Sequence, residues 1–332
     1  MTKILSYKSR SRKENVIVMV VLAISVIFTN SFIIFLPNED SRFYISGLIS
    51  TIAIGVALVI AIIMVWAYKR SIKKKEEEKQ QAFSQQDKDT KPHHYYYDDN
   101  KMHFSICLFL IFWFAASVIW TFEDEQSADI LVADALYYMG YASFGYFLYS
   151  MYYHFFRKEF EPFILILVAV IILIPVIYII DTIISTLRLL STQTVDIWVV
   201  IKNAAYPILD AAMIFPTVIM FWGARRIIRR YKNVILEEEQ KIGQEIREKD
   251  KSPSHSFVSS SASMWILLLF IAMMLSAAGD TGFAYTSAFD VTRVQNYVWI
   301  WNILYNSDHL CLAAALVGYR YFFSFSKIDK LC

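Results

Sequence analysis

Eight long apolar stretches run through this chain of 332 residues. A helix needs about 20 mostly apolar residues to cross roughly 30 Å of hydrocarbon, and each stretch is long enough. Hydrophobic residues make up 57% of the chain, so little sequence is left for a soluble catalytic domain. We therefore predict an all-α fold, a polytopic membrane helix bundle with eight transmembrane helices at 16–36, 45–67, 103–122, 130–156, 162–185, 197–222, 264–286 and 297–325.

The positive charges are divided unevenly between the two sides of this predicted bundle. Of the 32 Lys and Arg residues, 28 lie on the side that holds both termini, and the other side has only Arg42, Arg188, Lys202 and Arg293. An excess of Lys and Arg marks the cytoplasmic side, so we expect a cell-membrane protein with both termini in the cytoplasm. The basic clusters lie directly beside spans, where anionic lipid explains them, and we expect no nucleic-acid partner.

The segments between the spans suggest three parts. Residues 1–68 form an N-terminal helical hairpin, 69–101 form a charged cytoplasmic loop that begins as a helical extension, and 102–326 form a six-helix membrane core. That core includes a charged cytoplasmic helical extension and linker at 223–263. The loops on the opposite side are short, so a ligand from that side would have to enter the bundle itself.

Several titratable and polar residues lie inside the predicted spans. An ionisable side chain at bilayer depth costs about 2.5–3.5 kcal/mol on insertion scales, and such residues usually face the bundle interior. Interhelical hydrogen bonds of about 0.6 kcal/mol each are the structural alternative for any one of them. We predict no catalytic, metal or cofactor site, but a ligand or proton site formed by Asp134, Tyr138, Tyr206, Asp210, Asp280, Asn302, Asp308 and His309.

Helical spacing places many of these residues on shared faces, as a common internal site would require. The fourth span has Asp134, Tyr138, Tyr141 and Tyr152 along one face, the sixth has Asn203, Tyr206, Asp210 and Thr217, and the eighth has Asn302, Tyr305, Asn306 and His309. Pro207 stands three residues before Asp210, and a proline kink beside a midplane carboxylate is typical of a binding cavity or a moving element.

Three of these segments also carry a family resemblance: Ala133-Asp134-Ala-Leu-Tyr-Tyr-Met-Gly-Tyr141, Ala205-Tyr-Pro-Ile-Leu-Asp210 and Ala278-Gly-Asp280-Thr-Gly-Phe-Ala-Tyr285. Over 103–325 the chain resembles the multi-pass sensor region found ahead of diguanylate cyclase and histidine kinase domains in bacteria and archaea. The last span departs from that pattern, because its segment 301–308 lacks the leading acid. The resemblance implies a sensor, and because no output domain lies within these residues, its output would reside in a partner chain.

Three functions remain open at this point. The first is a sensory or signal-transducing membrane module without enzyme activity, whose partners are the lipid bilayer and a cytoplasmic signalling protein or a second copy of the chain. The second is a proton- or cation-coupled transporter that uses the same carboxylates as relay groups. The third is an intramembrane hydrolase in which Asp210 and Asp280 share a proton to activate water.

Overall fold

The computed structural model describes residues 2–83, 99–122, 129–153, 205–223 except Pro207, 256–289 and 291–326, with a few single positions between 166 and 226. All secondary structure in these residues is helical, and none of them forms a strand. Four of the helices are long and apolar enough to cross a membrane. The predicted all-α fold is therefore confirmed for the described residues, and the four apolar helices support a membrane protein.

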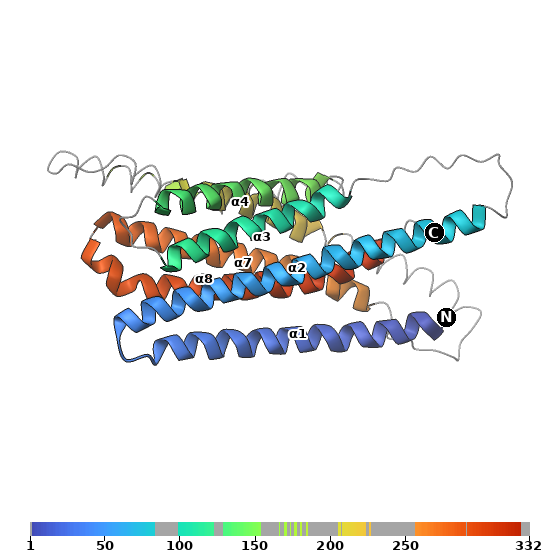
Figure 1. Ribbon diagram of the computed structural model, residues 1–332, viewed down its shortest axis with the longest axis horizontal. Coiled ribbons are helices and arrows are strands. Elements are labelled where there is room, and N and C mark those ends of the chain that lie inside the picture. Colours follow the sequence, from blue (N-terminus) through green and yellow to red (C-terminus); the bar gives the residue numbers. More distant parts are fainter. Residues whose placement is uncertain are drawn as a thin grey trace.

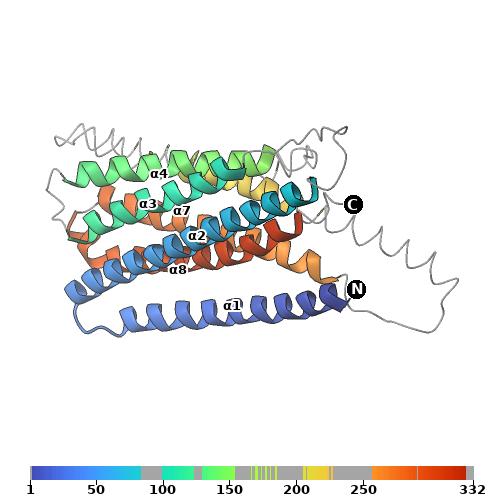
Figure 2. The same cartoon turned by 45° about the vertical axis from the view of Figure 1, so that its right-hand side comes forward.

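The helices run side by side and form an elongated bundle (Figure 1). The start of α1 and the end of α8 lie at the same end of the bundle in both views (Figure 2). A further helical segment, residues 205–223, lies between α4 and α7 in the sequence. The bounds of the helices are α1 Thr2–Ile34, α2 Glu39–Phe83, α3 Asp99–Phe122, α4 Asp129–Met151, α7 Ser256–Phe289 and α8 Val291–Ser326.

The four most apolar helical stretches correspond to the first, second, third and seventh predicted spans. They are Val16–Ile34, Asp40–Ala67, Lys101–Phe122 and Met264–Phe283. The sixth predicted span contains a shorter apolar helix, Ile208–Gly223. Helices α4 and α8 cover the fourth and most of the eighth predicted spans, but they carry many Tyr, Asn and Asp residues that lower their hydropathy.

Some predictions fall partly or wholly beyond the described part of the chain. Most of the fifth predicted span, 162–185, lies outside the described residues, as do Asn203 and Pro207. The same is true of most of the segment 223–263 that was predicted as a charged extension and linker. Helix α7 begins at Ser256, inside that segment. The serine-rich end of the segment therefore belongs to the same helix as the seventh predicted span.

A tight turn joins α1 to α2. Pro37 has no backbone N–H to continue a helix, and α1 ends just before it. The Arg42 guanidinium donates from Nε to the Leu36 carbonyl oxygen at 2.8 Å, which satisfies an acceptor beyond the helix end. Helix α2 then begins at Glu39, and the acidic side chain of Asp40 in its first turn interacts favourably with the helix dipole.

Helix α2 continues far beyond its apolar part. It has 45 residues, and its apolar stretch ends at Ala67. The 16 residues from 68 to 83 add about 24 Å at 1.5 Å per residue. This confirms the helical extension predicted at the start of 69–101, and it makes α2 a continuous rod from one end of the bundle to well past the other.

Helix α8 lies at the centre of the described bundle, where it packs against α7, α2 and α1. It approaches α7 so closely that a Cβ atom on Gly282 would lie 2.3 Å from Trp301 Cζ3, and one on Gly279 would lie 2.7 Å from Tyr305 Cε1. Helix α1 is peripheral by comparison, because only 6% of its span is buried, against 56% of the span in α3.

Candidate ligand-binding site

A cavity of about 150 Å³ lies inside the bundle, in the half nearest the α1–α2 turn. Helices α2, α3, α4, α7 and α8 all contribute to its wall, and Tyr206 of segment 205–223 completes it. The lining residues of each helix recur at intervals of three or four, with adjacent pairs in α2 and α3, so each helix presents one face to the same space. The cavity is therefore formed by the assembled bundle and not by any single motif.

Two helices supply a wall of hydroxyl and aromatic groups. Helix α2 contributes Phe43 and Tyr44 near its start, followed by Gly47, Ser50 and Thr51 deeper in the bundle. The step from Tyr44 to Thr51 is about 10 Å along the helix axis. Helix α3 packs beside α2 and contributes Trp113, Ser117, Trp120 and Thr121. The Thr51 and Thr121 hydroxyls lie 2.9 Å apart and join the two helices at this wall.

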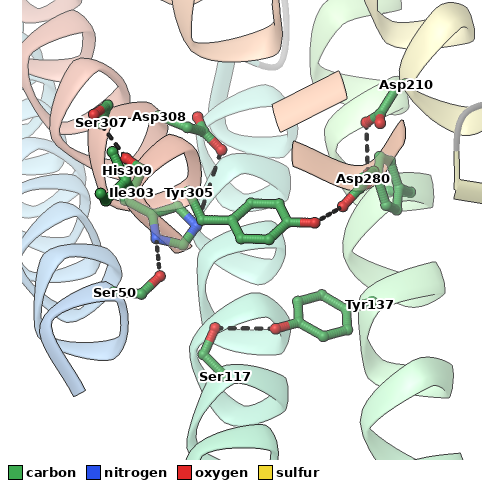
Figure 3. A network of polar contacts seen from close by, with 11 residues as sticks. Ser50, Ser117, Tyr137, Asp210, Asp280, Ile303, Tyr305, Ser307, Asp308 and His309 are labelled. Atoms are coloured by element: carbon green, nitrogen blue, oxygen red, sulfur yellow. Dashed lines mark hydrogen bonds and ion pairs between the residues drawn. The ribbon is translucent and has the colours of Figure 1, made fainter. Parts of the chain in front are cut away.

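Asp280 of α7 is the only carboxylate among the described lining residues, and two phenols contact it. The Tyr305 hydroxyl of α8 donates to its Oδ1 atom, and Figure 3 shows this side chain pointing directly at Asp280. The Tyr141 hydroxyl of α4 lies 3.0 Å from Asp280 Oδ2 and 2.6 Å from Asp210 Oδ1. Tyr141 thus bridges the carboxylates of α7 and of segment 205–223.

The bridge at Tyr141 has two oxygen contacts but only one hydroxyl proton. A phenol carries one hydroxyl proton, so Tyr141 can donate to only one of the two carboxyl groups at a time. A proton on one of the two carboxyl groups would supply the other oxygen contact and remove the repulsion between two acceptors. The Asp210–Tyr141–Asp280 bridge therefore accommodates one proton shared between the two carboxyl groups.

A second polar cluster joins α8 to α2. Ser50 Oγ lies 3.0 Å from His309 Nδ1, and Asn302 Nδ2 donates to Ser46 Oγ at 2.8 Å. His309 Nε2 lies 4.0 Å from Asp308 Oδ2, at the outer limit of an ion pair. Both His309 and Asp308 are buried, but only His309 lines the cavity. Figure 3 shows His309 between Ser50 and Asp308.

A third cluster holds segment 205–223 against α4. The Tyr206 hydroxyl donates to Asp134 Oδ1 at 2.7 Å, and the ring of Tyr138 stacks on that of Tyr206 with centroids 5.4 Å apart. Neither Asp134 nor Tyr138 lines the cavity. Their contacts instead position Tyr206, whose own side chain does line it.

The eight residues predicted for the site thus occupy different places. Tyr206, Asp280, Asn302 and His309 line the cavity, whereas Asp210, Asp134, Tyr138 and Asp308 lie behind it and contact it through a neighbour. The site also includes residues absent from that predicted set. The sequence already places Tyr141 and Tyr305 on the polar faces of their spans. For the hydroxyl residues of α2, the four-residue spacing of Ser46 and Ser50 is the one sequence feature that indicates a shared polar face.

The fold and the cavity together define a class: an all-helical membrane protein with a polar, aromatic cavity inside its bundle. No protein-family model, curated protein or solved structure matches this chain. A function for the chain has to be inferred from the residues of the site.

Proposed function

We propose that this protein is a sensory membrane module that binds a small ligand in the cavity and transmits the binding event along α2. The single observation that carries the proposal is the double role of this helix. Gly47, Ser50 and Thr51 of α2 line the cavity, and the same helix continues without a break to Phe83. The distance from Thr51 to Phe83 is about 48 Å along the axis. A transporter needs no such extension, whereas a receptor uses it to reach a partner.

The charge asymmetry of the sequence supports an orientation for this module. Both termini would lie in the cytoplasm, because 28 of the 32 Lys and Arg residues lie on their side of the predicted spans. The cavity lies toward the opposite end, where α2 begins and α3 ends, and so would receive its ligand from outside the cell. The extension of α2 would then project into the cytoplasm of a cell-membrane protein with eight spans.

The resemblance to sensor regions ahead of diguanylate cyclase and histidine kinase domains supports the same role. Such a module would act on a cytoplasmic signalling protein or on a second copy of the chain. Ligand binding can shift a two-state bundle only if the ligand has different affinities for the two states. The wall shared by five helices supports such a difference, because any relative movement of these helices changes the cavity.

Purification in mild detergent, followed by mass spectrometry of the co-purifying proteins, tests this function. We expect a kinase, cyclase or response regulator to be recovered with the chain. A variant in which residues 71–83 are replaced by a Gly/Ser segment of equal length should lose that partner, because the helix is broken while the length is kept. Recovery of the chain as a monomer without a signalling protein, or of the same partner with the variant, would contradict a sensory role for α2.

A second candidate is a proton-coupled transporter, and the Asp210–Tyr141–Asp280 bridge is the observation that favours it. This chain of contacts leads from the cavity to a buried carboxyl group behind it, as a proton relay would. Proteoliposomes loaded with a pH-sensitive dye test this directly. Proton flux that is lost in the Asp210→Asn variant would favour transport over sensing.

The arrangement gives less support to an intramembrane hydrolase. Of the two aspartates, only Asp280 lines the cavity, and Asp210 lies behind Tyr141. A water molecule activated jointly by two carboxylates needs both to face the substrate.

A further inference from the structure

We propose that the ligand of this cavity is a small organic cation of the quaternary-ammonium type, held by the aromatic side chains of the cavity wall and by Asp280. This inference deepens the proposed function and rests on it, since it names the ligand class of the same site. Three properties of the cavity carry it: the charge of its wall, the kind and arrangement of its rings, and its size.

The charge of the wall has one sign. Asp280 contributes the one carboxylate, and no Lys or Arg occurs among the described lining residues. Arg42 lies only two residues from Tyr44, but its guanidinium bonds to the Leu36 carbonyl and lies 5.1 Å from the ring centroid of Trp299. A negatively charged ligand would therefore meet a carboxylate without a compensating cation, whereas a positively charged ligand would be paired.

The proton bridge adds to this preference. One arrangement places the shared proton on Asp210, which then donates to the Tyr141 oxygen. The Tyr141 hydroxyl can then donate to Asp280 Oδ2, and the Tyr305 hydroxyl donates to Asp280 Oδ1. Asp280 is then a carboxylate whose oxygens both accept phenol hydrogen bonds, which replace part of its water shell. A cation in the cavity stabilises this arrangement over the one with the proton on Asp280.

The rings form walls at right angles to one another. Nine of the 17 lining residues are aromatic. Trp113 and Tyr137 meet at an interplanar angle of 82°, and Trp120 and Phe283 meet at 86°. Rings at right angles offer both edges and faces to the enclosed space, and the faces attract cations through their quadrupole. Quaternary ammonium groups are recognised in this way because they have no N–H groups that need hydrogen-bond acceptors.

The size of the cavity limits the ligand. A volume of about 150 Å³ accommodates a molecule of roughly the size of benzene. A trimethylammonium group with a short polar tail fits this volume. Asn302 and His309 of α8 line the same cavity and can bond to such a tail. Each is hydrogen-bonded to a serine of α2, which fixes its position. A bare metal ion would gain little from the aromatic wall, because hard cations prefer oxygen ligands.

Calorimetric titration of the full-length chain in lipid nanodiscs tests the ligand class. The two probes are choline and its neutral isostere 3,3-dimethylbutan-1-ol, which has the same shape without the charge, and empty nanodiscs correct for partition into lipid. We expect choline to bind about tenfold more tightly than the isostere. Equal affinities for the two probes would overturn the proposal.

Three variants connect that preference to the site. Asp280→Asn should reduce the preference for choline to the part that the aromatic rings supply and leave isostere binding unchanged, which also shows that the variant is folded. Asp40→Asn, which removes an exposed carboxylate at the start of α2, should retain the preference. Trp120→Leu should weaken choline binding more than isostere binding, and this variant provides the test if Asp280→Asn does not fold. Retention of the full preference in either cavity variant would overturn the proposal.

The outcome also separates the ligand class from the sensory function. Gly47→Phe should fill the cavity, because a Cβ at this position meets only Thr121 atoms, at 3.5 and 3.7 Å. If both probes bind equally well and both are lost in Gly47→Phe, the ligand class is wrong and the cavity still binds ligands. Whether the chain recruits a signalling partner is decided independently by the co-purification experiment.

Discussion

The two halves of the bundle are formed by the same helices but are packed in opposite ways. In α4, Tyr137 and Tyr141 line the cavity, whereas Phe144 and Phe147, one to two turns further on, are fully buried in a closed apolar core. The rings of Phe109 and Phe144 stack there with centroids 4.5 Å apart. Helices α7 and α8 show the same change, from Asp280 and His309 on one side to Trp265 and Tyr319 on the other.

This contrast separates stability from binding along the length of each helix. The closed half is densely packed and fixes the relative positions of the helices, because packed cores tolerate little change in volume. The half with the cavity carries buried polar groups that cost free energy in a membrane and do not fill their space. We infer that the closed half supplies the rigid support that a preorganised site requires.

The largest effect is expected from truncation in the closed half. Phe144→Ala removes a fully buried ring that contacts Phe109 and Phe147, and it should lower the free energy of unfolding by about 3 kcal/mol. Unfolding by SDS titration in mixed micelles measures the change. Ile62→Ala, at a side chain that is 51% exposed, is the matched control and should change stability by about 0.5 kcal/mol or less. Equal effects at the two positions would contradict a closed core around Phe144.

A smaller effect is expected from adding one methyl group to each half. A Cβ on Gly318 would lie 2.8 Å from Trp265 Cβ, so Gly318→Ala forces α7 and α8 apart and should cost about 2 kcal/mol. A Cβ on Gly47 would meet its nearest atom, Thr121 Oγ1, at 3.5 Å, an ordinary contact. Gly47→Ala should therefore leave the unfolding free energy nearly unchanged. Thermal unfolding of both variants in the same detergent checks the difference, and a costlier Gly47→Ala would show that the cavity half is equally tight.

The bridging tyrosine should contribute less than these packing changes. Tyr141→Phe leaves the carboxyl groups of Asp210 and Asp280 without their shared hydroxyl and should cost about 1.5 kcal/mol, since bonds to charged groups are the stronger ones. Tyr137→Phe removes only the neutral contact with Ser117 at 3.2 Å and should cost less. Both values come from the same SDS titration.

A double variant shows whether Tyr141 acts through the proton that it shares with Asp210. If it does, Asp210→Asn combined with Tyr141→Phe should cost clearly less than the two single changes added together. Additive costs would mean that the two side chains act independently and that the bridge has no energetic role.

Much of the fold could be predicted from the sequence, because apolar length and charge are local properties of a segment. The helical extension of α2, the burial of Asp210 and His309 and the partial burial of Asp280 follow from such local rules. The choice between Tyr137 and Tyr138 does not. Adjacent helical residues differ by about 100° in direction, so the same span places Tyr137 on the cavity and Tyr138 behind it, and only packing against α3 and segment 205–223 decides which.

The participation of α2 in the site also could not be predicted from the sequence, for a different reason. Apart from Phe43 and Tyr44 near its start, its contribution to the site consists of a glycine and short hydroxyl side chains, which cost little in an apolar span and so leave little trace in hydropathy. Ser50 gains its role from His309, 259 positions later in the chain. A partner so distant in sequence is identified only when the helices are placed side by side.

The smallest expected effect concerns the peripheral helix α1. Among the described side chains of α1, Asn30 forms a polar link to the rest of the bundle through the bond from its Nδ2 to Ser307 Oγ of α8, at 2.9 Å. Interhelical hydrogen bonds in membranes contribute about 0.6 kcal/mol on average, because the separated helices also find other partners. A double-mutant cycle of Asn30→Ala and Ser307→Ala should yield a coupling energy of that size, with ligand affinity unchanged, since neither residue lines the cavity. A coupling above about 1.7 kcal/mol, the upper end of such bonds, would instead make α1 part of the rigid support.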